Sequence, residues 1–222
     1  MTEIVIDGRF RGPDESGNGG YTCGLVARTV GGPVAVTLRL PPPLDVPLRV
    51  EGGCVWHGDM LVAELAPADV DLDPPAAPSW EAAVAAQRPD LDSPFPNCFV
   101  CGHGRSDDDG LRIHAGPVPG TGLVAAPWVP RQDTVGEEFV WAALDCPGAY
   151  ATGAMGRGVV VLGRLAARVA RVERVARAGE RCVVVGWPLG SKGRKHGAGT
   201  ALYSAGGGEL LGLARAVWIE PR

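Results

Sequence analysis

Two short segments of the chain resemble each other and constrain the fold more than any other feature. Residues 19–28 and 148–157 carry Gly, Tyr, Gly and Arg at the same offsets. A turn signal precedes each segment, Ser16-Gly17-Asn18 in the first copy and Asp145-Cys146-Pro147 in the second. Both segments are therefore predicted to begin a helix, and their small residues would let a sheet pack closely against it.

Alternating apolar runs follow each predicted helix, as is typical of half-buried antiparallel strands. The runs comprise residues 34–40, 48–55 and 60–65 after the first helix, and 159–172, 181–187, 199–204 and 210–219 after the second, with a glycine hairpin turn at 206–208. One helix followed by several meandering strands, twice, predicts an α+β fold. Each half would wrap an antiparallel sheet around a central helix.

A proline-rich stretch separates the two halves. We expect an N-terminal half at 1–73, a linker at 74–96 and a C-terminal half at 97–222. Within the linker, Ser79 is expected to cap a short helix over residues 80–87. The two halves could pair with each other in a monomer, and exposed sheet edges would also permit a homodimer.

Composition narrows the class of protein. The net charge of −4 gives no general reason to expect nucleic acid as a partner. No apolar run approaches the roughly 18 residues of a membrane span, and the acidic start lacks signal-peptide features. A cytoplasmic protein without a membrane partner is expected, and its six cysteines are expected to be reduced thiols.

Several motifs carry a family resemblance. Asn18-Gly19-Gly20-Tyr21 followed by residues 36–44 resembles the acyl-CoA thioesterase II-like branch of the hotdog superfamily, and residues 141–147, 199–203 and 210–218 resemble the second half of related double hotdog proteins. The resemblance implies a double hotdog fold and hydrolysis of an acyl-CoA or acyl-carrier thioester, without a cofactor. Because hotdog proteins also include members without demonstrated activity, a protein that binds an acyl or pantetheine ligand without turnover is the alternative.

Asp145 is the best candidate for a catalytic carboxylate. It follows the apolar residues 141–144 and precedes the second predicted helix, where it could act as general base or nucleophile. Capping of that helix by its side chain is the alternative interpretation. The corresponding first-half residue is Ser16, so one working site per chain is expected, with Asn18 available to orient a water or a carbonyl.

Backbone amides at helix starts can stabilise the oxyanion that forms during thioester hydrolysis. The hotdog resemblance implies that the acyl carbonyl lies near Gly19-Gly20 and Gly148-Ala149. Related enzymes often combine the acid with a Gln or Thr, and the candidates here are Thr200 and Gln132. Thr200 is equally consistent with an ordinary strand position. A hydratase would want an Asp and His pair, and neither helix entry contains His.

Residues 192–196 form a basic cluster that includes Arg194 and Lys195. These two side chains could bind the phosphates of coenzyme A or of a carrier pantetheine arm. A solvated hairpin is the alternative.

The spacing of Cys98 and Cys101 resembles half of a zinc knuckle, and a closed site would need two further ligands such as His103 and His114. Because a second pair of this spacing is absent from the sequence, buried thiols in a structural turn are favoured and no metal is expected. Residues 107–110 lack the spacing of a calcium loop and are expected to form a solvated turn.

Overall fold

The computed structural model describes residues 2–89, 93–155, 157–170, 176–206 and 208–221. The strands of the first half are β1 (Thr2–Val5), β2 (Val34–Leu38), β3 (Pro47–Glu51), β4 (Cys54–His57) and β5 (Met60–Pro67). Those of the second half are β6 (Gly116–Val118), β7 (Leu123–Trp128), β8 (Val161–Val169), β9 (Cys182–Lys192), β10 (Lys195–Ser204) and β11 (Leu210–Ile219). The helices are α1 (Gly19–Ala27), α2 (Trp80–Ala86), α3 (Glu137–Ala143) and α4 (Cys146–Ala151), with short 3-10 turns at Gly8–Phe10 and Gln132–Thr134.

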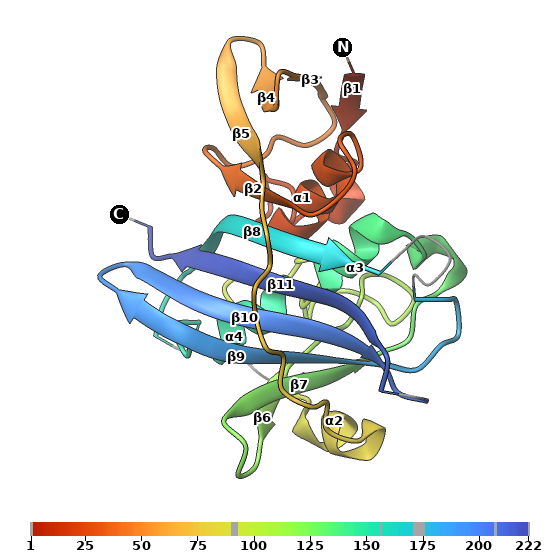
Figure 1. Ribbon diagram of the computed structural model, residues 1–222. Coiled ribbons are helices and arrows are strands. Elements are labelled where there is room, and N and C mark those ends of the chain that lie inside the picture. The colour runs from red at the N-terminus through yellow and green to blue at the C-terminus, as the bar shows by residue number, and fades with distance from the viewer. Residues whose placement is uncertain (1, 90–92, 156, 171–175, 207, 222) are drawn as a thin grey trace.

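All described strands belong to one antiparallel sheet in the order β1-β3-β4-β5-β2-β8-β11-β10-β9-β7-β6 (Figure 1). The first half arranges its strands β1-β3-β4-β5-β2, with α1 between β1 and β2 in the chain. The second half repeats this order as β7-β9-β10-β11-β8, with α3 and α4 between β7 and β8, and adds β6 at the outer edge. The halves meet where β2 pairs with β8, from Val34 opposite Ala167 to Thr37 opposite Arg164.

The two helices of the predicted repeat differ in length. Helix α1 begins at Gly19 as predicted and has nine residues, whereas α4 begins at Cys146 and has six. Gly153 follows the end of α4 with a φ of 67°, a left-handed conformation that terminates helices. Arg157 therefore lies beyond the helix, and residue 156 of the repeat lies outside the described residues.

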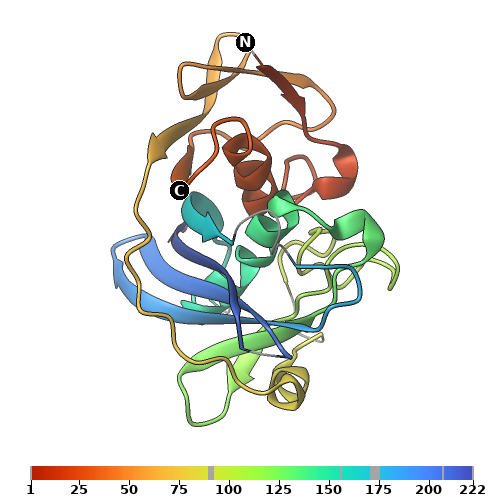
Figure 2. The same ribbon diagram turned by 45° about the vertical axis from the view of Figure 1, so that its right-hand side comes forward.

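Helix α3 was not predicted, because the apolar run 141–144 has no side-chain cap at its start; Gly136 occupies the N-cap position. Helices α1 and α3 lie side by side on the inner face of the sheet (Figures 1 and 2). Around them, the rings of Phe10, Tyr21, Phe99 and Phe139 form a cluster whose closest pair, Phe10 and Tyr21, is stacked with centroids 4.1 Å apart. This aromatic cluster joins residues of both halves into one core.

The linker crosses the outer face of the second half before it reaches α2 (Figure 1). It covers a second apolar cluster there, in which Val70 is buried, and the Tyr203 hydroxyl donates to the carbonyl of Pro75 at 2.7 Å. Ser79 Oγ accepts from the Ala82 amide at 3.1 Å and caps α2.

The predicted run 48–55 is not one strand, because Gly52 and Gly53 form a turn between β3 and β4. In the second half, strand ends differ from the predicted runs. Strand β8 covers 161–169, and the last two residues of the predicted run lie outside the described residues. One residue of the predicted glycine turn, 207, also lies outside them. Within the described ranges, no helix is long and apolar enough to cross a membrane.

Candidate active site and thiol cluster

A cavity of about 530 Å³ lies between the start of α1, the chain after β2, and strands β8 and β11. Its size is within the usual range of small-molecule sites, roughly 300–1,000 Å³. The walls are mostly apolar, and its buried polar groups include Asn18, Asp145 and three cysteine thiols. The arrangement fits an apolar ligand with one polar group held at a defined place.

Asp145 lies at the break between α3 and α4 and is 2% exposed. Its Oδ2 accepts hydrogen bonds from the Gly20 amide at 2.9 Å and from Asn18 Nδ2 at 3.0 Å. Its Oδ1 has no hydrogen-bond partner among the described residues. Burial raises the pKa of this carboxyl to about 7, although the bonds from Gly20 and Asn18 act to lower it.

The alternative interpretation of Asp145 as the side-chain cap of α4 is wrong. Its side chain makes no capping bond to α4 and instead accepts from the first turn of α1, in the other half. Asp145 therefore completes a site made by both halves of the chain. That contact could not be deduced from local sequence.

Asn18 caps α1, a role that was not predicted from the sequence. Its Oδ1 accepts from the Tyr21 amide at 2.9 Å, while its Nδ2 donates to Asp145 and lies 3.7 Å from Cys98 Sγ. Both ends of the amide are thus engaged by protein atoms. The structure places Asn18 where it orients the Asp145 carboxylate rather than where it is free to hold a substrate.

The two predicted oxyanion segments differ in position. Gly19 lines the cavity, and its amide has no acceptor in the described ranges, whereas the Gly20 amide is used by Asp145. Gly148 and Ala149 are buried and do not line the cavity, and the Gly148 amide already donates to the carbonyl of Asp145 at 2.9 Å. Of the two predicted segments, the start of α1 is therefore the one that offers an amide to a ligand in this cavity. The indole Nε1 of Trp218, which also lines the cavity, has no partner among the described residues.

Thr200 does not reach the cavity. Its hydroxyl donates to the carbonyl of Leu144 at 2.7 Å, which fixes the end of α3 one residue before Asp145. Gln132 is exposed in a 3-10 turn and does not line the cavity either. The predicted partnership of Asp145 with Thr200 or Gln132 is therefore absent from the described site.

Arg194 and Lys195 lie at the exposed end of the β9–β10 hairpin. Arg194 Nη1 donates to the carbonyl of Glu220 at 2.8 Å, and Lys195 pairs across the sheet with Ile219, which lines the cavity. Arg194 and Lys195 thus lie one strand away from a cavity wall and do not line the cavity with Asp145.

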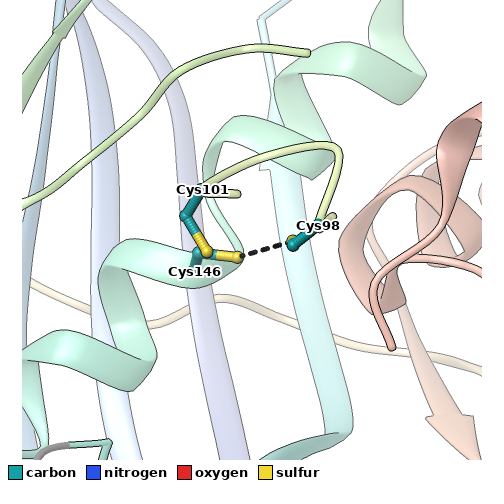
Figure 3. A group of neighbouring side chains, drawn as sticks. All are labelled: Cys98, Cys101 and Cys146. Atoms are coloured by element: carbon teal, nitrogen blue, oxygen red, sulfur yellow. Dashed lines mark hydrogen bonds between the residues drawn. The ribbon is translucent and has the colours of Figure 1, made fainter. Parts of the chain in front are cut away.

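Three cysteines meet at the cavity (Figure 3). Cys98 and Cys101 come from the turn before β6, and Cys146 from the first turn of α4; their sulfurs all lie within 4.8 Å of one another. Hydrogen bonds from the Cys101 and Cys146 thiols hold the pKa of the Cys98 thiol well below its usual value. Sequence spacing could not indicate Cys146 as the third member, because it follows Cys101 at a long separation.

The histidines proposed as additional ligands do not join these thiols. His103 is exposed, and His114 is buried with its Nε2 unpartnered among the described residues. Burial lowers the pKa of His114.

Solved structures identify the fold. A protein of unknown function with a hotdog fold from Alicyclobacillus acidocaldarius matches with a TM-score of 0.66 and 11% identity, over 99% of this chain and 92% of that chain. A proposed thioesterase from Novosphingobium aromaticivorans matches with a TM-score of 0.60 and 16% identity, over 99% and 95%. A TesB protein from Mycobacterium avium subspecies paratuberculosis matches with a TM-score of 0.57 and 15% identity, over 95% and 89%.

The fold is therefore the hotdog fold, as the motifs indicated, and similar structures include thioesterase-like proteins. A scan against protein-family models finds no match, and a search of curated proteins finds none.

Proposed function

We propose that this chain is a double hotdog protein that hydrolyses an acyl thioester, with Asp145 as general base. The observation that carries the proposal is the Asp145 carboxylate itself, buried at an apolar cavity with one oxygen fixed by two donors and the other unpartnered among the described residues. Burial of a carboxylate oxygen without a hydrogen-bond partner is unfavourable in free energy, and carboxylates buried in this way are found most often at active sites.

The double hotdog assignment is supported by topology. Each half orders its strands in the same way around its own helices, and the two halves join edge to edge through β2 and β8. Asp145 comes from the second half and its two donors come from the first. The pairing of halves is thus what assembles the site.

The chemistry requires a base, a water and a donor for the developing oxyanion. Asp145 Oδ1 would accept a proton from a water that attacks the thioester carbonyl carbon, while Oδ2 stays fixed by Asn18 and Gly20. The Gly19 amide would donate to the carbonyl oxygen as it becomes negative. Collapse of the tetrahedral intermediate breaks the C–S bond, and the proton held by Asp145 passes to the departing thiolate, giving a carboxylic acid and a free thiol.

The substrate class follows from the cavity walls and the hairpin. The apolar side chains of Leu38, Phe95, Met155 and Leu162 suit an acyl chain. The exposed cations Arg194 and Lys195 suit the phosphates of coenzyme A or a pantetheine arm.

Thiol release from a panel of acyl-CoAs of increasing chain length tests the proposal. Purified protein is expected to release free thiol with a preference for one range of chain lengths, since the cavity has a fixed volume. Binding of acyl-CoA without thiol release from any member would instead support the second candidate, a binding protein without turnover. The absence of Thr200 and Gln132 from the cavity favours that candidate.

The Lys195→Ala variant tests whether the β9–β10 hairpin binds the phosphates of acyl-CoA. We expect KM for acyl-CoA to rise about 10-fold with kcat unchanged, because one charge-assisted hydrogen bond to a phosphate is lost. The matching acyl-N-acetylcysteamine thioester carries no phosphate, so its KM should not change. Equal KM values for wild type and variant on acyl-CoA would place the phosphates elsewhere.

A further inference from the structure

The thiol cluster of Cys98, Cys101 and Cys146 has features that neither core packing nor thioester hydrolysis explains. Each residue is 4% exposed or less, and all three line the cavity. Their sulfurs lie within 4.8 Å of one another, and the cysteines are not joined as disulfides. Figure 3 shows the three side chains converging from two separate segments of the chain.

The separation of the Cys98 and Cys146 sulfurs matches that expected at a tetrahedral metal site. Two thiolates bound to Zn²⁺ at about 2.3 Å in tetrahedral geometry lie about 3.8 Å apart. Cys98 Sγ and Cys146 Sγ are separated by 3.8 Å. That spacing is too long for a disulfide, whose sulfurs lie about 2 Å apart.

The turn that carries the first two cysteines is built closely around the Cys98 sulfur. Asn18 Nδ2 donates a hydrogen bond to it at 3.7 Å. A Cβ at Gly102 would lie 2.4–2.6 Å from the backbone of Pro96 and Cys98, so only glycine lets the chain turn so tightly here. Hydrogen bonds of this kind orient metal-binding thiolates and stabilise their charge.

From this geometry we infer that Cys98, Cys101 and Cys146 bind one thiophilic divalent cation, Zn²⁺, whose fourth coordination position faces the cavity. Across the described ranges, no further Cys, His, Asp or Glu joins the group. Three protein ligands with one open position are typical of zinc sites that bind water or a ligand, whereas purely structural sites use four. The inference does not depend on thioester hydrolysis.

Zinc content and coordination test the site directly. The full-length protein, prepared with reductant from zinc-supplemented cells, is expected to contain one zinc per chain by elemental analysis. X-ray absorption should show three sulfur neighbours at about 2.3 Å and one lighter neighbour. Chelator-treated protein titrated with Co²⁺ should develop the visible bands of tetrahedral cobalt thiolate.

Serine variants of single cysteines test whether zinc binds at this cluster and not at the other thiols. Cys146→Ser is expected to weaken Zn²⁺ binding at least about 100-fold, because one of three ligands is lost. Cys23→Ser alters a buried thiol outside the cluster, and Cys54→Ser a half-buried one, so neither should change zinc content. Circular dichroism of each variant establishes that it is folded.

The inference is overturned if wild-type protein neither retains zinc nor binds Co²⁺ after reduction, or if its thiols prove to be joined as a disulfide in freshly purified protein. It is also overturned if folded Cys146→Ser binds Zn²⁺ as tightly as the wild type. Because wild-type coordination is measured independently, a variant that fails to fold leaves the test intact. Thiol release from acyl-CoA has no part in these readouts.

Discussion

The Asp145→Asn variant is expected to lose thioesterase activity and to become more stable above neutral pH. A carboxamide cannot accept the proton of the attacking water, so kcat should fall on the order of 100- to 10,000-fold. Its oxygen can still accept from Gly20 and Asn18 in place of Oδ2, while its NH₂ group replaces the unpartnered Oδ1. The fold should therefore be retained.

The stability gain follows from the raised pKa of Asp145. The folded carboxyl has a pKa of about 7 against 3.8 as the ordinary value, so between these pH values the folded state holds a proton that the unfolded state has lost. The free energy of unfolding of the wild type should therefore fall as pH rises from about 4 to 7. The buried charge costs about 4 kcal/mol in total, at about 1.4 kcal/mol per pH unit.

Urea unfolding at several pH values, on chelator-treated protein, measures this effect. The difference in unfolding free energy between Asp145→Asn and wild type should be near zero at pH 4 and about 4 kcal/mol at pH 8. Asp59→Asn alters an exposed turn residue and serves as the control. A constant difference across the range would show that Asp145 is not held neutral by burial.

Gly20→Ala is expected to cause the second large effect. A Cβ at residue 20 would lie 2.4 Å from Asp145 Cβ and 2.7 Å from the carbonyl oxygen of Trp141. Neither neighbour can rotate away, so α1 must move and lengthen the bond from the Gly20 amide to the carboxylate. We expect a loss of about 3 kcal/mol in unfolding free energy, more than the helix preference of alanine offsets.

The folded Gly20→Ala protein should also have lower thioesterase activity, because the hydrogen bond from the residue 20 amide that holds the Asp145 carboxylate in place is weakened. Chemical denaturation and thiol release measured on the same preparation check both effects. Gly158→Ala is the matched control, since a Cβ there meets no neighbour and should change stability by less than about 1 kcal/mol. A Gly20→Ala variant as stable and active as this control would contradict the close packing of α1 against Asp145.

Local signals predicted the parts of the site that depend on local structure. Asn18 followed by small residues indicated the start of α1, and Asp145 was found because a charge stood in an apolar run. Local signals could not predict contacts between residues that lie far apart in the sequence. The bond from Gly20 to Asp145 and the approach of Cys146 to Cys98 both depend on how the halves pack.

Thr200 illustrates the limit of reasoning from residue type. Its place in a strand was an open alternative, and the direction in which its hydroxyl points depends on the packing of β10 against the end of α3, where it bonds to Leu144. Helix α3 was missed because Gly136, which has no side chain, occupies its N-cap position. In both cases the local structure depends on tertiary packing, which a local sequence pattern does not show.

A crystal structure of Asp145→Asn with an unhydrolysed acyl-CoA tests the central claim most directly. We predict that the acyl chain fills the cavity between α1 and β8, with the thioester carbonyl oxygen within hydrogen-bonding distance of the Gly19 amide and the carbonyl carbon facing residue 145. An acyl group bound elsewhere, or a thioester carbon turned away from residue 145, would contradict the assignment of this cavity as the site of hydrolysis.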